Sequence, residues 1–541
     1  MTKKSFVKGA AILAAAGLLV KVLGAVFRIP LTNLITPDGM ANYSVAYPIY
    51  ATLVVISTAG LPSAISRMVS ARVIVGDYRG AHKVFTTALK LLFVVGLIST
   101  IALFFLADTI ATMNKIPTAA LGIKLISPSL FFVAVLSAYR GYFQGLQQMV
   151  PTASTQIVEQ VVKLGAGLLL ASLWISRGVE YGAAGALLGV SLSEVGALAL
   201  IIIMYNRRKK DIKLHRRQTH VPPLQTKYKS LRRELVTIAI PITLGASIMP
   251  IIMAIDTFII NNILPLVDYS AFNPLPAKTN FGILTGSVNP LVNMPAVLSV
   301  ALAMSLVPAI SEARAKNDLL AVSSRSGMGF KLAILIGLPS ALGMFLLSDN
   351  IISLLFSSGL TPQELAVGGE LLQILAVAVL FLTMLQTTTG IIQGAGKPFI
   401  PLINLAIGAA VKVVLSIVLM RIPSLNINGA AIGTAACYTI AALLNIIAMQ
   451  RIAKPSIKPM SGVFMPIVAA LFMGGAVYII KYFLLNTLGN TTTTLVAIVV
   501  AIVVYVFMLF LTKAISIDDM EYIPGGGFIT RVMRKLRLWK V

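Results

Sequence analysis

Long apolar runs recur along the whole chain, and they constrain its fold more than any other feature. Each run can cross the roughly 30 Å hydrocarbon core of a bilayer as a helix, which takes about 20 residues. With 57% hydrophobic and 11% charged residues among 541, the chain cannot enclose these runs in one soluble core. The pattern predicts an all-α polytopic membrane protein with fourteen transmembrane helices. They lie at about 6–35, 43–66, 84–107, 119–143, 150–174, 182–205, 235–264, 284–310, 328–348, 365–393, 398–420, 428–449, 462–484 and 493–513.

Lysine and arginine residues are distributed unevenly among the connecting segments. If the N-terminus is cytoplasmic, the segments predicted inside hold most of the 44 basic residues. The segments predicted outside hold Lys115, Arg177, Lys278, Arg421 and Lys481. Because basic loops stay on the cytoplasmic side, this asymmetry predicts that both termini are cytoplasmic. The net charge of +26 then reflects topology and contact with anionic lipid head groups, and not binding of nucleic acid.

The first twelve predicted helices contain an internal repeat. Segments from Gly60, Arg140 and Tyr181 are echoed in the same order from Leu306, Thr389 and Asn428, and Lys163 corresponds to Lys412. Six helices per repeat return the chain to its starting side, which predicts two pseudo-symmetric lobes of parallel orientation with a substrate site between them. The predicted parts are an N-lobe (1–205), a basic cytoplasmic loop (206–233), a C-lobe (234–450), helices 13 and 14 (451–514) and a basic cytoplasmic tail (515–541).

Charged residues inside the apolar runs are mostly basic. A charge at this depth is costly unless it faces a partner or a water-filled cavity. The basic residues are Lys21, Arg28, Lys90, Lys124, Lys163 and Lys412, and the acidic residues at comparable depth are Glu159, Glu194 and Asp256. The excess of positive charge predicts an anionic cargo, and a phosphate-bearing substrate would supply the missing negative charge.

Several segments carry a family resemblance. LVKVLGAVFRIPL from Leu19, RGYFQGLQQMVPTASTQIVEQVVK from Arg140, EYGAAGALLG from Glu180 and LVPAISE from Leu306 resemble the polysaccharide-exporter branch of the multidrug/oligosaccharidyl-lipid/polysaccharide (MOP) flippase superfamily. Within it, the chain most resembles the stage V sporulation protein B type and the Gram-positive lipid II flippases. The resemblance implies a plasma-membrane flippase that moves an undecaprenyl-pyrophosphate-linked glycan precursor, with lipid II for peptidoglycan as the first candidate, to the outer leaflet by alternating access.

Lys21 and Arg28 are the first candidates for substrate binding. They are seven residues apart, so both project from the same face of a helix, where they could hold a pyrophosphate through charge-assisted hydrogen bonds. The resemblance supports Lys21, because lipid II flippases carry functional basic residues in helix 1. In the alternative, Lys21 snorkels or pairs with Glu159, and Arg28 reaches the outer head groups.

The other candidates for substrate binding are Arg67, Arg140, Glu159, Lys163 and Lys412. Glu159 and Lys163 have i, i+4 spacing, so they either pair on one helix or contact the cargo. Lys412 has no acid four residues before it, which predicts an unpaired lysine facing the cavity. Arg67 and Arg140 lie near predicted cytoplasmic helix ends, where they either meet an entering head group or anchor the helix.

The sequence says less about the driving force of transport. There is no P-loop of the form GxxxxGK[ST], so transport is expected to be coupled to an ion or to the membrane potential, or to run downhill. Asp256 and Asn404 are the candidate ligands of a coupling cation, sodium or proton, because related flippases use these helices for a sodium site. Asp256 could instead cap a local break or pair with a lysine.

Other classes of function fit the residues less well. A cation-coupled multidrug exporter of the same superfamily would need acids in its cavity, and basic residues dominate there. A flippase for another polyprenyl-linked polysaccharide unit fits as well as a lipid II flippase. No constellation of carboxylates, His or Cys predicts catalysis or a metal cofactor. We therefore expect a monomeric transporter and not an enzyme.

Overall fold

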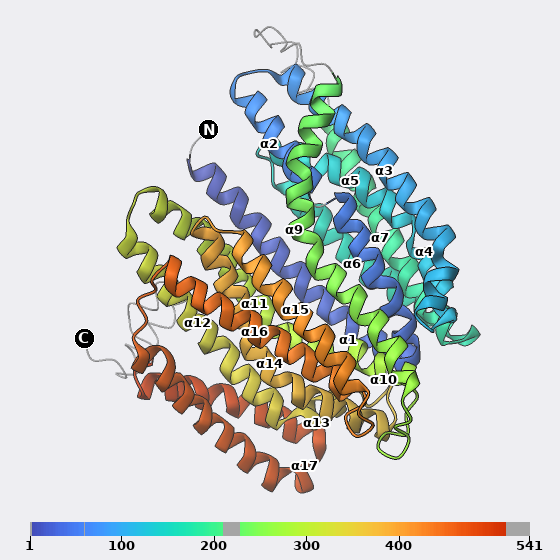
Figure 1. Ribbon diagram of the computed structural model, residues 1–541, viewed down its shortest axis with the longest axis vertical. Coiled ribbons are helices and arrows are strands. Elements are labelled where there is room, and N and C mark those ends of the chain that lie inside the picture. The colour runs from blue at the N-terminus through green and yellow to red at the C-terminus, as the bar shows by residue number, and fades with distance from the viewer. Residues whose placement is uncertain (1–2, 59, 209–227, 515–541) are drawn as a thin grey trace. The chain divides into compact units, whose positions relative to one another are not determined.

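Helices form all the regular structure in the described part of a computed structural model of the chain, residues 3–58, 60–208 and 228–514 (Figure 1). The predicted tail 515–541 and most of the predicted loop 206–233 lie outside these residues. The α-helices are α1 (Lys3–Thr58), α2 (Gly60–Ile74), α3 (Tyr78–Met113), α4 (Ala120–Ile126), α5 (Pro128–Gly145), α6 (Val150–Trp174), α7 (Val179–Arg207), α9 (Tyr228–Ile263), α10 (Ala277–Ile283), α11 (Asn289–Ala315), α12 (Leu319–Leu346), α13 (Ser348–Phe356), α14 (Pro362–Gly394), α15 (Phe399–Met420), α16 (Asn428–Ile452) and α17 (Met465–Leu511). Short π-helices, η4 (Leu284–Val288) and η5 (Met460–Phe464), precede α11 and α17.

Thirteen helical segments of the described chain are long and apolar enough to cross a membrane, which confirms the predicted all-α polytopic class. The first of them, Ala15–Ile74, spans 60 residues, or about 90 Å at 1.5 Å per residue. It is not one straight rod, because Thr36 breaks α1 with φ 60° and ψ 173°. Gly489 breaks α17 in a similar way, with φ 71° and ψ 172°.

The chain divides into two compact units. Unit 1 comprises Met1–Pro290, Ser358–Leu360 and Arg421–Ile427, and unit 2 comprises Leu291–Ser357, Thr361–Met420 and Asn428–Val541. Within unit 1, α1 packs against α6, α7, α9 and α10, and α6 packs along α7. Within unit 2, α15 packs along α16, and α14 lies against both α12 and α16. The repeat predicted a different division of the chain, into lobes 1–205 and 234–450. This division stays a prediction.

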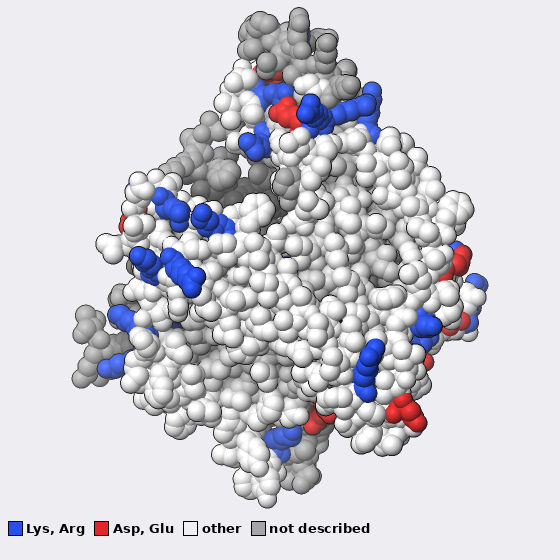
Figure 2. Space-filling model, viewed as in Figure 1, with Lys and Arg blue, Asp and Glu red and all other residues white. Residues whose placement is uncertain are grey.

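Many large apolar side chains point outward from the helices. On α3, for example, Phe105 is 75% exposed and Ile98 is 61% exposed. One face of the molecule shows broad areas without Lys, Arg, Asp or Glu (Figure 2). Such surfaces would promote aggregation in water, but they are what a helix needs where it meets lipid tails.

Residues that correspond in the sequence repeat make matching contacts in the two units. The Asp77 carboxylate accepts a hydrogen bond of 2.7 Å from the Gly80 amide at the start of α3. The Asp318 carboxylate accepts one of 2.9 Å from the Ala321 amide at the start of α12. Each side chain satisfies an amide that the helix itself leaves without a partner. The repeat therefore specifies the same N-terminal cap twice.

Removal of either cap should destabilise the protein by about 0.5–2 kcal/mol. We expect Asp77→Ala and Asp318→Ala to lower the unfolding temperature of the purified protein in detergent. Asp77→Asn and Asp318→Asn should retain most of the stability, because the Asn side-chain oxygen can accept the same hydrogen bond. If Asn proved as damaging as Ala, these residues would not act as caps.

Candidate functional site

Two basic side chains lie against aromatic rings inside unit 1, where the two arms of α1 meet α6. The guanidinium carbon of Arg28 is 4.8 Å from the ring centroid of Tyr43 and 5.6 Å from that of Tyr47. The Lys163 Nζ is 5.0 Å from the centroid of Tyr47 and 5.2 Å from that of Phe27. All four distances are within the range of cation–π attraction. We call these five residues the cation–aromatic cluster.

Local features of the sequence explain why these rings and charges meet. The break at Thr36 turns the second arm of α1 back, so that Arg28 before the break reaches Tyr43 after it. Tyr43 and Tyr47 are one helical turn apart and stack, with centroids 5.5 Å apart and an angle of 15° between the ring planes. Lys163 is only 9% exposed. The rings therefore shield a lysine that the helix packing buries.

Some polar atoms of this cluster are buried without a hydrogen-bond partner. They include Nη1 of Arg28 and the hydroxyl oxygen of Tyr43. A buried polar group that makes no hydrogen bond costs about 1–3 kcal/mol, and a charged one costs more. An anionic oxygen is the partner that a guanidinium binds most strongly. The cluster is thus built to accept negative charge.

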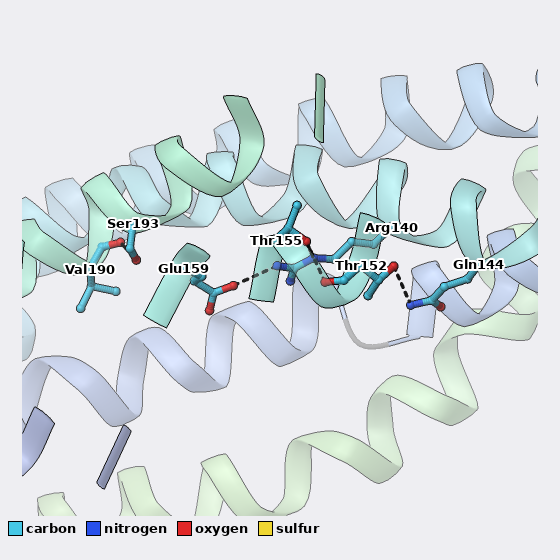
Figure 3. A network of polar contacts seen from close by, with 7 residues as sticks. All are labelled: Arg140, Gln144, Thr152, Thr155, Glu159, Val190 and Ser193. Atoms are coloured by element: carbon cyan, nitrogen blue, oxygen red, sulfur yellow. Dashed lines mark hydrogen bonds and ion pairs between the residues drawn. The ribbon is translucent and has the colours of Figure 1, made fainter. Parts of the chain in front are cut away.

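Arg140 forms a second polar group that links α5 to α6 (Figure 3). Its Nη2 lies 3.0 Å from the Glu159 carboxylate, and its Nε donates to the Thr155 hydroxyl at 3.1 Å. Gln144 donates to the Thr152 hydroxyl at 3.5 Å, one turn closer to the end of α5. We call these five residues the Arg140 network. They cross-link two consecutive helices through a charged pair that is largely withdrawn from solvent.

The network corrects the pairing suggested by the i, i+4 spacing. Glu159 forms its ion pair with Arg140 of α5 and not with Lys163 of its own helix, whose ammonium group faces Phe27 and Tyr47. The alternative in which Lys21 pairs with Glu159 is wrong for the same reason. Arg28 is engaged by Tyr43 and Tyr47 within the unit, and so does not point away toward head groups.

A further acid, Glu194 of α7, lies beside both groups. It is 4% exposed, and its Oε2 is buried without a hydrogen-bond partner. Its charged neighbours are Glu159, Arg140 and Lys163. With Arg28 included, three basic and two acidic side chains meet in this part of unit 1. The sequence had shown Glu194 only as a deep acid and gave it no role.

The remaining predicted substrate-binding residues lie elsewhere. Lys21 on α1 and Arg67 on α2 have exposed side chains in unit 1, outside the cation–aromatic cluster. Lys412 is buried in α15 of unit 2, with 7% exposure, and the residue is not free of interactions, which corrects the expected unpaired lysine. Within unit 1, the structure therefore brings together Arg28, Arg140, Glu159 and Lys163 from the predicted set, and Lys21 and Arg67 do not join this group. Lys412 belongs to the other unit.

The two predicted cation ligands belong to different units. Asp256 is half-buried on α9 in unit 1 and has interactions of its own. Asn404 on α15 in unit 2 donates a hydrogen bond of 2.8 Å from its amide to Oδ1 of Asn445. Among the described residues, no group of three or more His, Cys, Asp or Glu could hold a metal ion. A cation site at Asp256 and Asn404 stays a prediction.

The aromatic part of the site was not predicted from the sequence. Tyr43, Tyr47 and Tyr50 are spaced i, i+4 and i+7, so they lie on one helix face within an apolar run. Tyrosines on one face of a membrane helix close to deep basic residues are a signal that could have indicated the cluster.

Comparison with known proteins places the chain among membrane transporters. Residues 6–314 match the family model described as "Polysaccharide biosynthesis protein", and residues 241–418 match the model described as MatE. The chain is 27% identical over 531 residues to the stage V sporulation protein B of Bacillus subtilis (strain 168), with 97% of this chain and 99% of that protein covered. It is also 27% identical over 494 residues to the lipid II flippase MurJ of the same organism, with 88% of each covered.

Solved structures share the fold. A structure of the lipid II flippase MurJ in an inward closed conformation matches with a TM-score of 0.68 and 15% identity, over 92% of this chain and 98% of that one. A multidrug resistance MATE family transporter of the MOP superfamily, in an inward-facing conformation, matches with a TM-score of 0.67 and 16% identity, over 83% and 99%. At such identities, the likeness concerns the fold alone.

Proposed function

Because the chain belongs to the polysaccharide biosynthesis protein family, whose fold it shares with MOP-superfamily transporters, we propose that it is a flippase for a polyprenyl-pyrophosphate-linked glycan precursor. It is a multi-pass protein of the plasma membrane, and its relatives are transporters and not enzymes. The proposed cargo is lipid II of peptidoglycan biosynthesis, moved from the inner to the outer leaflet by alternating access. The similarity to a lipid II flippase over 88% of the chain supports this choice.

One observation carries the proposal: the cation–aromatic cluster holds a guanidinium with a buried Nη1 that has no hydrogen-bond partner. A pyrophosphate must lose its hydration to cross a membrane, and arginine can replace that water with paired N–H donors. Lys163 adds a second positive charge at the same rings. Lys21, Arg67, Arg140, Glu159 and Lys412 remain proposed substrate contacts along the path. Asp256 and Asn404 remain proposed ligands of a coupling sodium ion or proton.

The proposed topology has fourteen spans and cytoplasmic termini. The segment Ala15–Ile74 is too long for one crossing and is broken at Thr36, so we count it as two spans. This raises the thirteen segments to fourteen. In the proposed transport cycle, the repeat-related halves 1–205 and 234–450 rock against each other, and the basic loop and tail contact anionic lipids.

Two competing functions have a basis in the comparisons or the site. The shared fold with a MATE multidrug transporter, together with the two acids Glu159 and Glu194, suggests export of cationic drugs. However, Glu159 is neutralised by Arg140, and three basic side chains surround the acids. Another polyprenyl-linked polysaccharide unit would present the same pyrophosphate and fits the cluster equally well.

Leaflet accessibility of lipid-linked precursors should decide among these functions. In cells in which this protein is the only flippase for lipid II, depletion should remove lipid II from the outer leaflet, as measured by an impermeable probe added outside. Re-expression of the wild type should restore it at least tenfold. Unchanged exposure of lipid II, with loss of another polyprenyl-linked glycan, would shift the assignment to that glycan. Efflux of a cationic dye with no change in any precursor would establish the drug exporter.

A further inference from the structure

Glu194 occupies an unusual position for an acid in a membrane protein. It comes from α7 and is buried beside a carboxylate, Glu159, that already has an ion-pair partner in Arg140. Its Oε2 accepts no hydrogen bond. A buried carboxylate oxygen that lacks a donor makes the ionised form of the group more costly than the neutral form. The contacts of Glu194 therefore do not explain why an acid occupies this position.

The second half of the repeat provides an internal comparison. In the repeat, Thr389 takes the place of Arg140, Asn404 that of Thr155, and Gly408 that of Glu159. At these positions, neutral groups link α14, α15 and α16: Asn404 donates to Asn445 at 2.8 Å, and Asn445 donates to Thr389 at 3.0 Å. Asn445 is 0% exposed.

The two sets of three helices differ in the charge of the groups that link them. In the triplet α14, α15 and α16, amide and hydroxyl groups occupy the positions that correspond to the Arg140 network. The triplet α5, α6 and α7 instead buries an ion pair and a third charge. A buried ion pair is weak evidence for stability, because desolvation offsets much of the attraction. The charges in unit 1 therefore call for a reason other than packing.

The groups around Glu194 define what it can bind. Its titratable neighbours are Arg140 on α5, Glu159 and Lys163 on α6, and Tyr50 on the second arm of α1. Two neighbouring carboxyl groups that are withdrawn from water do not both ionise readily, and one proton relieves their repulsion. That proton would also give Glu194 a hydroxyl, which can donate a hydrogen bond to a neighbouring carboxylate such as Glu159.

We propose that Glu194, with Glu159 and Arg140, forms a proton-binding site in unit 1 that is coupled to the anionic cargo. The inference rests on the proposed function, because it takes a pyrophosphate as the ligand of the nearby Arg28 and Lys163. With the proton bound, three basic side chains face one ionised acid, and without it they face two. The protonated state therefore attracts a pyrophosphate more strongly. By thermodynamic linkage, cargo binding must increase proton binding by the same factor.

Binding of undecaprenyl pyrophosphate to the purified full-length protein tests the coupling. We expect the affinity of the wild type for the pyrophosphate to fall about fivefold or more as rising pH removes the proton from the site. A factor of this size is usual for two coupled binding sites. In Glu194→Gln, Glu159 keeps its ion pair with Arg140 and the second carboxyl group is gone, so the affinity of the variant should depend on pH less than that of the wild type. Titration of the pyrophosphate itself is common to both proteins and cancels in their comparison. The matched control is Glu180→Gln, which changes another acid of α7 at its first turn and should behave like wild type.

A second readout separates failure of this inference from failure of the proposed function. The carboxylic-acid band of the infrared difference spectrum should appear on acidification of the wild type and be lost in Glu194→Gln, whether or not a ligand is present. If the band behaves in this way but no variant binds the pyrophosphate, the proton site stands and the cargo assignment fails. If the wild type binds the pyrophosphate with the same pH dependence as Glu194→Gln, or if the band persists in Glu194→Gln, the proton site is wrong.

Discussion

Arg28→Ala is expected to reduce the appearance of lipid II in the outer leaflet by at least tenfold, at equal amounts of protein in the membrane. The substitution removes the guanidinium that has a buried, unsatisfied Nη1 and that lies against Tyr43 and Tyr47. Loss of one partner from a buried charged contact costs about 2–5 kcal/mol. Even the lower end of this range exceeds a tenfold change. Arg28→Lys should recover only part of the transport, because an ammonium cannot offer paired N–H donors.

The matched control for this prediction is Lys90→Ala. Lys90 is another basic residue of a predicted span, but its side chain is exposed on α3, away from the cluster. We expect nearly normal transport from this variant. Outer-leaflet lipid II should be quantified with an impermeable probe, and protein abundance should be checked in the same membranes. Normal transport by Arg28→Ala at normal abundance would refute a role for the cluster in holding the cargo.

Gly185→Ala should strongly destabilise unit 1. A Cβ at Gly185 of α7 would lie 2.6 Å from the carbonyl oxygen and 2.8 Å from the carbonyl carbon of Leu170 on α6. These are backbone atoms, so the two helices themselves must separate. Overpacking of this kind costs about 1–3 kcal/mol, and more when backbone must move. Because α6 carries Glu159 and Lys163, the displacement should also disturb both polar groups of the site.

Gly165→Ala provides the control on the neighbouring helix. Gly165 lies within α6, and a Cβ there would meet no atom within 4 Å. Alanine is favoured over glycine inside a helix by about 0.5–1 kcal/mol. We therefore expect Gly165→Ala to match or exceed the wild-type unfolding temperature in detergent, and Gly185→Ala to fall well below it. Equal unfolding temperatures for the two variants would contradict the close approach of α6 and α7.

The sequence predicted the helices better than it predicted their contacts. The apolar run at 150–174 coincides with α6 at Val150–Trp174, because hydrophobicity and length alone decide where a chain crosses a bilayer. The caps Asp77 and Asp318 also follow from local chemistry, which the repeat displays twice. Features that depend on one helix, or on the ends of one helix, can thus be inferred from the order of residues alone.

Contacts between helices depend on rotation and on side-chain direction, which one sequence does not reveal. The spacing of Glu159 and Lys163 suggested a pair along α6, but a residue on α5, Arg140, lies closer to the carboxylate in space. Lys163 turns instead to rings from both arms of α1. The candidate basic residues could therefore be predicted from the sequence, whereas their aromatic partners and the role of the neighbouring acid Glu194 could not.

The ion pair between Arg140 and Glu159 also bears on how the protein enters the membrane. The two residues belong to consecutive helices, α5 and α6, joined by the short segment 146–149. Each charge alone would oppose insertion of its helix by up to about 2.5–3.5 kcal/mol at the centre of a span. If the helices leave the translocon together as a hairpin, the charges can neutralise each other before either meets lipid. The order of the helices along the chain thereby makes buried charges compatible with biogenesis.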